Sequence, residues 1–347
     1  MNFSRILLQW YSFNKRDLPW RNTHNPYFIW LSEIILQQTR VEQGLPYYLK
    51  FTKAFPAVTD LAKAKEDKVL KLWQGLGYYS RARNLHFSAK YVSQYYNGIF
   101  PKTYNDILKL KGVGTYTAGA IASFSFGLPY AVVDGNVIRV LSRVFGIEIP
   151  FDITLGKKKY QSLAQNLLDT KNPALHNQAI MEFGALQCTP KSPKCSSCPF
   201  ISECVAYNTN SIEKFPVKSK KLKIKKRFLN YLLVQNEDGV ILGKRNEGIW
   251  KGLYEFPFLE YSTKKSEKEV ISSNEWIDFF KNKQYKIESV SERFLHKLSH
   301  QHIYAQFWTV HVKEVEFENY SFVKKSKLKN YPVSRLTDKF LTAHNII

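Results

Sequence analysis

Long apolar runs are missing from this sequence of 347 residues. No uninterrupted apolar stretch approaches the roughly 18 residues that mark a membrane-spanning helix, so we expect no such helix. The N-terminal stretch MNFSRILLQWYSFNKRD also lacks a signal-peptide layout, because its apolar run is short and no small-residue cleavage site follows. These two absences predict an intracellular protein without a membrane anchor.

Cysteine is scarce and is confined to one short segment, residues 188–204. No cysteine elsewhere can pair with this set across the fold. In a reducing compartment, the arrangement favours a metal or cluster site over disulfides. The two-residue gap between Cys195 and Cys198 can present both sulfurs to one centre. Zinc and a 4Fe–4S cluster are both compatible with this arrangement. The four candidate ligands are Cys188, Cys195, Cys198 and Cys204.

Acidic residues are too few to balance the basic ones. The chain has 51 Lys and Arg against 29 Asp and Glu, which gives a formal net charge of +22. Such a chain attracts polyanions, and nucleic acid is the leading candidate over an anionic membrane surface. The length predicts two domains, and a hydrophobic content of 44% is enough for two cores.

The pattern changes near residue 210. Residues 1–210 show apolar positions at helical spacing, with regular Gly and Pro breaks and no strand-like alternation. Residues 211–227 read as a basic linker or as a basic strand entering a second domain, and KSKKLKIKKR within them contains seven basic residues in ten. Residues 228–347 contain β-branched and aromatic runs that predict strands, and a helix is expected around 267–282.

One carboxylate lies in the apolar stretch WLSEIILQQT, residues 30–39. Asn25 and Pro26 just upstream are a suitable helix start, so Glu33 should lie on a helix. An exposed helix face is the simpler explanation for this acid. The alternative is a carboxyl in a dry pocket, where its pKa rises and it can donate a proton near neutral pH.

A glycine hairpin follows in ILKLKGVGTYTAGAIASFSFG, residues 107–127. Gly112 and Gly114 allow close backbone approach, and their N–H groups with the next helix N-terminus can hold a phosphate. An ordinary turn between two helices is the alternative. Asp134 follows in VVDGNVIRVLSR, where it could simply cap a helix. Together, Glu33 and Asp134 supply the two carboxyls that cleavage of a glycosidic bond needs.

The sequence resembles the MutY-type adenine DNA glycosylases over nearly its whole length. The cysteine spacing resembles the cluster signature of the endonuclease III and MutY glycosylases, which implies a 4Fe–4S cofactor. The other motifs that carry the resemblance are LPWR (18–21), WLSEIILQQTRV (30–41), WQGLGYYSRARNL (73–85), GVGTYTAGAI (112–121), VVDGNVIRV (132–140) and GIWKGLYEFP (248–257).

This resemblance implies a mainly α, helix-hairpin-helix glycosylase domain with a cluster loop, followed by an α+β, Nudix-like domain. It makes Glu33 the general acid and base, Asp134 the stabiliser of the sugar cation, and Tyr116 a neighbour of the reacting centre. The residues expected to line the adenine pocket are Trp20, Arg21 and Gln178. The residues expected to wedge into the duplex are Gln38, Leu76 and Tyr78. The alternatives are core packing for Trp20 and Leu76, a surface ion pair for Arg21 and half-buried packing for Tyr78.

Two departures from related patterns refine the expectation. Tyr116 stands where bifunctional endonuclease III-like enzymes carry a Schiff-base lysine, which predicts base removal without efficient strand cleavage. The C-terminal region has no stretch with the Nudix carboxylate spacing, so we expect no Mg²⁺ site and no nucleotide hydrolysis. Leu298, Ser299 and His300 stand where the family usually has a Phe-Ser-His turn that reads 8-oxoguanine.

The expected partner is double-stranded DNA with adenine opposite 8-oxoguanine or guanine, bound by a monomer in a bacterial-type cytoplasm, at the nucleoid. A pyrimidine glycosylase and lyase of the endonuclease III kind is a second possibility, which Tyr116 and the C-terminal region disfavour. The third is a non-catalytic DNA-binding scaffold. Glu33 and Asp134 argue against it, because carboxyls beside a DNA groove repel phosphate.

Overall fold

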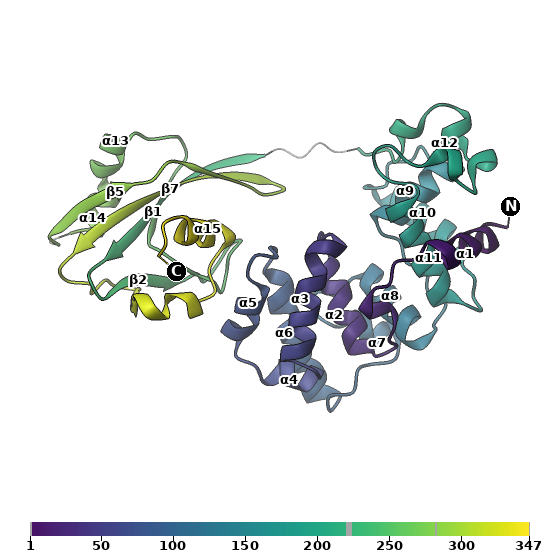
Figure 1. Ribbon diagram of the computed structural model, residues 1–347, viewed down its shortest axis with the longest axis horizontal. Helices are drawn as coiled ribbons and strands as arrows, with labels where there is room; N and C mark the ends of the chain where they lie inside the picture. The colour runs from purple at the N-terminus through teal and green to yellow at the C-terminus, as the bar shows by residue number, and fades with distance from the viewer. Residues whose placement is uncertain (1, 220–223, 282, 347) are drawn as a thin grey trace. The chain divides into compact units, whose positions relative to one another are not determined.

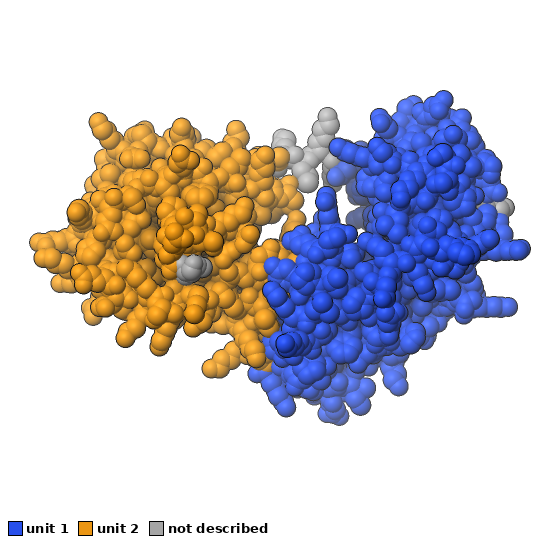
Figure 2. Space-filling model, viewed as in Figure 1, with its two compact units in different colours: residues 1–63, 84–221 blue, residues 64–83, 222–347 orange. Residues whose placement is uncertain are grey.

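The computed structural model describes residues 2–219, 224–281 and 283–346, and its contacts divide the chain into two compact units (Figure 2). The first unit comprises residues 1–63 and 84–221, and the second comprises residues 64–83 and 222–347. Part of the predicted basic linker, residues 220–223, lies outside the described residues. Each unit therefore takes up two separate stretches of the chain.

The first unit is helical (Figure 1). Its α-helices are α1 (Phe3–Asn14), α2 (Pro26–Leu36), α3 (Val41–Ala54), α4 (Val58–Lys63), most of α6 (Ser80–Tyr95), α7 (Tyr104–Leu108), α8 (Thr115–Phe126), α9 (Gly135–Phe145), α10 (Thr154–Leu167), α11 (Pro173–Leu186) and α12 (Val205–Asn208). Its 3-10 helices are η1 (Pro19–Arg21), η2 (Cys195–Ser197), η3 (Ile201–Glu203) and η4 (Ile212–Lys214).

One hydrophobic core joins α1, α9, α10 and α11, and α11 contacts both α1 and α9 (Figure 1). On α9, the buried side chains recur at the spacing of one helix face. They are Val137, Val140, Leu141 and Val144. This packing fixes the start of α9, and it therefore fixes the residue that caps α9, Asp134.

The second unit is a mixed sheet with short helices (Figure 1). The strand order is β3-β2-β1-β7-β5, while β4 pairs with β1, β6 with β7, and β8 with β2. Its strands are β1 (Lys225–Gln235), β2 (Gly239–Lys244), β3 (Tyr254–Glu255), β4 (Phe258–Tyr261), β5 (Tyr285–Val290), β6 (Phe294–Lys297), β7 (Gln301–Val312) and β8 (Ser321–Lys324). Its helices are α5 (Glu66–Trp73), α13 (Glu267–Ile271), α14 (Asn274–Phe279), η5 (Lys325–Asn330) and α15 (Arg335–Ala343).

The central strands β1 and β7 run parallel, from Lys225 opposite Gln301 to Gln235 opposite His311. The helix expected around 267–282 is instead two short helices, because the Ser273 side chain caps a new helix by accepting from the Trp276 N–H. Among the described residues, every helix is too short or too polar to cross a membrane.

Residues 64–83 belong to the second unit by their contacts, although they lie early in the chain. Asp67 on α5 forms a 2.7 Å ion pair with Lys244 on β2 and accepts a hydrogen bond from the Tyr254 hydroxyl. At the other end of α5, Lys71 Nζ donates to the Tyr331 carbonyl at 3.1 Å. These long-range bonds place the loop that follows α5 beside the C-terminal part of the chain.

Candidate active site

Glu33 is buried on α2, with only 7% of its surface exposed. Asn25 caps this helix by accepting from the Tyr27 N–H, and Pro26 is its first residue, as the sequence predicted. The pKa of Glu33 is raised to about 7, chiefly by burial and in smaller part by the nearby charge of Asp134, while Tyr116 and Arg21 oppose the rise. The exposed-face alternative is therefore wrong, and this carboxyl can hold or lose a proton near neutral pH.

Tyr116 lies in the first turn of α8 and hydrogen-bonds the Glu33 carboxylate. Burial, together with the neighbouring charge of Glu33, raises the pKa of the Tyr116 phenol well above its ordinary value. The hydroxyl therefore remains protonated and can donate to an ionised Glu33. This arrangement orients the carboxylate without supplying a nucleophilic amine.

Asp134 precedes α9 and caps it. Its Oδ1 accepts from the backbone N–H groups of Asn136 and Val137, both at 2.8 Å, and its Oδ2 accepts from the Asn136 side chain at 2.8 Å. Burial raises the pKa of Asp134, while these three hydrogen bonds favour the charged form and oppose the rise. The capping role and a role as a fixed anion are thus compatible in one residue.

The two carboxyls differ in the surroundings of their charge. Burial raises the pKa of both, and that of Glu33 reaches about 7, but Asp134 has three hydrogen-bond donors and the N-terminus of α9 beside it, which favour its charged form. Such a pair can supply one acid and one anion at the same pH. The chemistry open to it is proton donation to a leaving group beside a stabilised cation.

A buried ion-pair network supports the residues expected at the adenine pocket. Arg21 forms a 2.7 Å ion pair with Glu182 on α11, and Arg16 forms a second one at 2.8 Å. Burial raises the pKa of Glu182, but hydrogen bonds from both arginines outweigh it and bring the pKa to about 2. Glu182 is 1% exposed, so its charge is available only to these partners.

The same helix brings in Gln178, whose Oε1 accepts from the Tyr11 hydroxyl at 3.1 Å. The Arg21 guanidinium lies over the Tyr11 ring, 5.7 Å from its centroid. Trp20 is buried and meets Tyr48 edge to face at 5.1 Å. The three residues expected at the adenine pocket are thus held by partners on α1, α3 and α11.

Sequence reasoning missed Glu182, Arg16 and Tyr11, which orient these side chains. Glu182 lies four residues after Gln178, so the two share one face of α11. That spacing is the one available signal, and it is weak without knowing which helix lies opposite. The partners of Glu182 are 161 and 166 residues away in sequence, beyond the reach of any local pattern.

The glycine hairpin joins α7 and α8. Gly112 has φ 84°, which favours glycine, and a Cβ there would lie 2.9 Å from the Asn84 side chain. Gly114 caps α8 with φ −96° and no side-chain cap, and a Cβ there would meet nothing within 4 Å. No packing inside the described protein explains Gly114, which leaves the N-terminus of α8 open to an anion from outside.

The residues expected to wedge into DNA lie in tight turns. Gln38, after α2, is exposed and has φ 54°. In the second unit, Tyr78 has φ 48° and is 49% exposed, whereas Leu76 is buried at 5%. The Arg81 guanidinium lies 5.6 Å from the centre of the Tyr78 ring. Tyr78 is thus displayed at the loop tip, while Leu76 packs beneath it.

The turn from β6 to β7 carries Leu298, Ser299 and His300. Leu298 donates its N–H to the Gln301 carbonyl at 2.8 Å, which closes the turn, and the side chains of Ser299 and His300 are exposed. The Tyr78 hydroxyl donates to Ser299 Oγ at 3.4 Å. Within the second unit, the loop after α5 and this turn therefore meet at their tips.

The four cysteines are partly buried in the first unit and influence one another electrostatically. The pKa of Cys198 is raised to about 11, chiefly by burial and in smaller part by the charges of Cys188, Cys204 and Cys195. Four such thiols ionise together only if a cation compensates them. Arg143, which the sequence reasoning missed, donates to Cys188 Sγ at 3.5 Å and to the Thr189 carbonyl at 2.8 Å.

The four thiols suit either a zinc ion or an iron–sulfur cluster, because both can take four cysteine ligands. Within the described ranges, no group of three or more His, Cys, Asp or Glu side chains is arranged as a metal-ion site.

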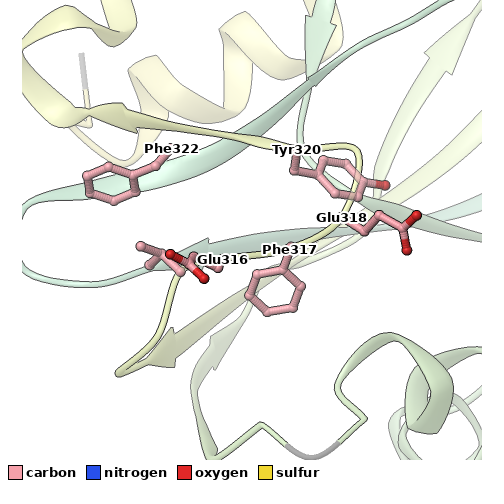
Figure 3. Close-up of a pocket in the computed structure, with 6 residues that line it drawn as sticks. Glu316, Phe317, Glu318, Tyr320 and Phe322 are labelled. Atoms are coloured by element: carbon pink, nitrogen blue, oxygen red, sulfur yellow. The ribbon is translucent and has the colours of Figure 1, made fainter.

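A surface hollow of about 580 Å³ lies beside the connection from β7 to β8 (Figure 3). None of the residues predicted at the site lines it. Glu316 and Glu318 would repel phosphate there, so the hollow does not belong to a DNA surface. It is lined by Val315, Glu316, Phe317, Glu318, Tyr320 and Phe322.

Two family descriptions match the chain. Residues 31–153 match the HhH-GPD superfamily base excision DNA repair proteins, and residues 230–343 match the NUDIX domain. The adenine DNA glycosylase of Buchnera aphidicola subsp. Baizongia pistaciae is 39% identical, covering 91% of this chain and 88% of that protein. The adenine DNA glycosylase of Homo sapiens is 46% identical, covering 59% of this chain and 39% of that protein.

Solved structures give the same fold for the helical region. A thermostable thymine-DNA glycosylase is similar with a TM-score of 0.56 and 32% identity, covering 60% of this chain and 95% of that chain. Endonuclease III in a non-covalent DNA complex has a TM-score of 0.53 at 20% identity, covering 60% of this chain and 94% of that chain. The helical domain thus has the endonuclease III-like fold, and the C-terminal mixed sheet is Nudix-like, as the sequence predicted. Because similarity to an adenine DNA glycosylase extends over 91% of its length, the chain belongs to the adenine DNA glycosylase family and is a DNA N-glycosylase, a hydrolase of base excision repair.

Proposed function

We propose that this enzyme removes adenine that is mispaired with 8-oxoguanine or guanine in double-stranded DNA, acting as a monomer. The observation that carries the proposal is the buried Glu33, whose pKa of about 7 lets it donate a proton at neutral pH. The names of the relatives specify adenine as the base removed. The opposing base is inferred from the turn at residues 298–300.

In this proposal, Glu33 protonates adenine N7, and the neutral base then leaves. Asp134, fixed as an anion by three hydrogen bonds, stabilises the positive charge that develops on the sugar. The ionised Glu33, oriented by Tyr116, then accepts a proton from the attacking water. One carboxyl thereby serves first as the acid and then as the base.

Adenine must leave the stack before these groups can reach it. Trp20, Arg21 and Gln178 form the pocket for the extruded base, with Arg21 held by Glu182. We assign the insertion into the duplex to Tyr78 and Gln38, whose exposure and positive φ suit display at a surface. Leu76 supports the loop and contacts DNA only if the loop opens.

The absence of an amine nucleophile at Tyr116 supports base removal without β-elimination. A lyase needs an amine that attacks the sugar, and the group that hydrogen-bonds Glu33 is a phenol that stays protonated. We therefore expect no borohydride-trapped covalent complex. A trapped complex would favour the endonuclease III-like alternative.

Contacts to phosphate and to the opposite base complete the assignment. The open N-terminus of α8, with Gly112 and Gly114, suits a DNA phosphate. Ser299 and His300 expose a hydroxyl and an imidazole that can hydrogen-bond an altered base edge, and Leu298 offers an apolar wedge without ring stacking. Recognition of 8-oxoguanine therefore depends more on hydrogen bonds than on stacking.

We propose that Cys188, Cys195, Cys198 and Cys204 hold a 4Fe–4S cluster, which the four-thiol donor set and the spacing of these cysteines in the sequence support. Bound there, the cluster would supply the positive charge that these thiolates need and would order residues 188–204. Lys191 and Lys194 in this loop would then be presented to DNA phosphates. We also propose residues 1–210 as the catalytic region and residues 228–347 as the lesion-reading region.

The test is single-turnover release of adenine from a duplex with adenine opposite 8-oxoguanine. Wild type is compared with Glu33→Gln, and with Glu213→Gln as a matched control at an exposed position of the same unit. We expect release by wild type and the control, and binding without release by Glu33→Gln. Binding without release by wild type would favour the scaffold alternative, and full activity of Glu33→Gln would refute the mechanism.

A further inference from the structure

The Gln74 side chain connects the loop that carries Tyr78 to the C-terminal part of the chain through hydrogen bonds. Its Nε2 donates to Asp338 Oδ1 at 2.8 Å. Its Oε1 accepts from the Val333 N–H at 3.2 Å and from Lys71 Nζ at 3.1 Å. Both ends of the side-chain amide are therefore used, which a carboxylate or an alkyl chain of the same length could not reproduce.

The loop after Gln74 holds an unusual backbone. Gly75, Gly77 and Tyr78 have φ angles of 96°, 79° and 48°. For Tyr78, a left-handed backbone costs roughly 1–2 kcal/mol, so the surroundings must hold it there. Trp73 Nε1 donates to the Gly77 carbonyl at 3.0 Å, and Arg81 Nη2 donates to the same carbonyl at 3.1 Å. Because these hydrogen bonds hold the backbone of the loop in one conformation, a displacement of Gln74 also displaces Tyr78.

The anchor at Asp338 belongs to α15, which packs on the strands that lead to the turn at residues 298–300. Phe340 on α15 stacks on Phe307 of β7, with ring centres 3.9 Å apart and planes 4° apart. Phe294 of β6 meets the Phe340 ring edge to face, with ring centres 6.3 Å apart. Residues on both strands of the turn thus touch the helix that Gln74 binds.

We propose that Gln74 is a positioning residue for reading the base opposite adenine. By tying the loop of Tyr78 to α15, it keeps the Tyr78 hydroxyl beside Ser299, where the two are 3.4 Å apart. The inserted ring and the turn at residues 298–300 then meet the same base pair in one fixed arrangement. This inference rests on the proposed function and adds a residue that touches neither DNA nor the reacting atoms.

The test uses an exchange of donor and acceptor. Gln74→Glu replaces the donor that faces Asp338 with a second carboxylate, so the hydrogen bond becomes a repulsion between like charges. Adding Asp338→Asn restores a donor opposite that carboxylate, with the polarity of the pair reversed. The readout is the ratio of single-turnover adenine release rates for 8-oxoguanine and for guanine opposite adenine, with DNA affinity measured beside it.

A matched control exists in the same unit. Gln235 Nε2 donates to Glu288 Oε2 at 2.9 Å, which is also a glutamine–carboxylate pair. Gln235 ends β1, whereas Lys225 at the other end of β1 donates to the His300 carbonyl. Gln235→Glu therefore introduces the same chemical change at the end of the strand that is remote from the turn.

We expect Gln74→Glu to lower the rate ratio roughly tenfold, the size of effect that loss of one partly buried hydrogen bond gives. The double variant should recover most of the wild-type rate ratio, and Gln235→Glu should leave the rate ratio unchanged. An unchanged ratio in Gln74→Glu, or no recovery in a double variant that binds DNA normally, overturns the inference. If Gln74→Glu does not fold, Asp338→Ala alone removes the acceptor of the same bond, and an unchanged ratio there overturns the inference. Wild type that releases no adenine would instead refute the proposed function.

Discussion

Replacing Glu33 with Gln should stabilise the protein at alkaline pH while abolishing catalysis. The pKa of Glu33 is about 7 in the fold, against 4.5 for an ordinary glutamate. The folded state therefore binds the proton more tightly than the unfolded state, and stability falls as pH rises from about 4.5 to about 7. The difference corresponds to about 3 kcal/mol of destabilisation once the carboxyl is ionised.

The measurement is thermal unfolding of wild type and Glu33→Gln, each at pH 5.5 and at pH 8.5. The substitution removes the titrating group and keeps the size and shape of the side chain. Over this interval, wild type should lose about 2 kcal/mol relative to the variant. For a domain of this size, that is a relative shift in Tm of roughly 4–8 °C. Glu213→Gln, at an exposed site, should show no such dependence.

A pH-independent difference between wild type and Glu33→Gln would refute the reasoning, because it would mean that Glu33 titrates alike in both states. A variant that is less stable at pH 8.5 than at pH 5.5, relative to wild type, would reverse the sign and refute it equally. The expected sign means that the proton donor is kept at a cost to stability. Such a cost is common where a site is built for chemistry.

The remaining predictions address the other parts of the site. The rate of adenine release should fall as pH rises through about 7, because Glu33 must be protonated to act as the acid, and a pH–rate profile at saturating DNA checks this. Asp134→Asn keeps the helix cap but removes the charge, so single-turnover release should drop by roughly 10²–10³ while Tm changes little. Glu182→Gln leaves Arg21 short of its carboxylate partner, and calorimetry should show a loss of about 3 kcal/mol in stability. Gly114→Ala should leave Tm unchanged, since its Cβ meets nothing, but should weaken DNA binding severalfold in a titration.

The sequence predicted most of the helical unit because its signals are local. The cap at Asn25, the apolar surroundings of Glu33 and the positive φ of Gly112 all act within a few residues of their position. The segment around 267–282 shows the limit of such signals. Its apolar pattern continues, but the Ser273 side chain starts a second helix within it.

The parts that the sequence could not predict depend on partners far along the chain. Glu182 holds Arg21 across 161 residues, and Gln74 binds Asp338 across 264 residues. A glutamine at the end of a short helix gives no periodic pattern that distinguishes a buried, hydrogen-bonded side chain from a solvent-exposed one. Only the fold shows that both ends of its amide are engaged.

The division of each unit between two stretches of chain affects the order in which the protein can assemble during synthesis. The first unit is complete once residue 221 has been added, whereas residues 64–83 need partners from residues 222–347. Asp338 is 117 residues beyond that point, and at roughly 5–20 residues per second the wait is on the order of ten seconds. Tyr78 is encoded in the first quarter of the chain, yet its loop is among the last parts to gain its neighbours. A ribosome that stalls in this interval would leave α5 without the sheet that it packs against.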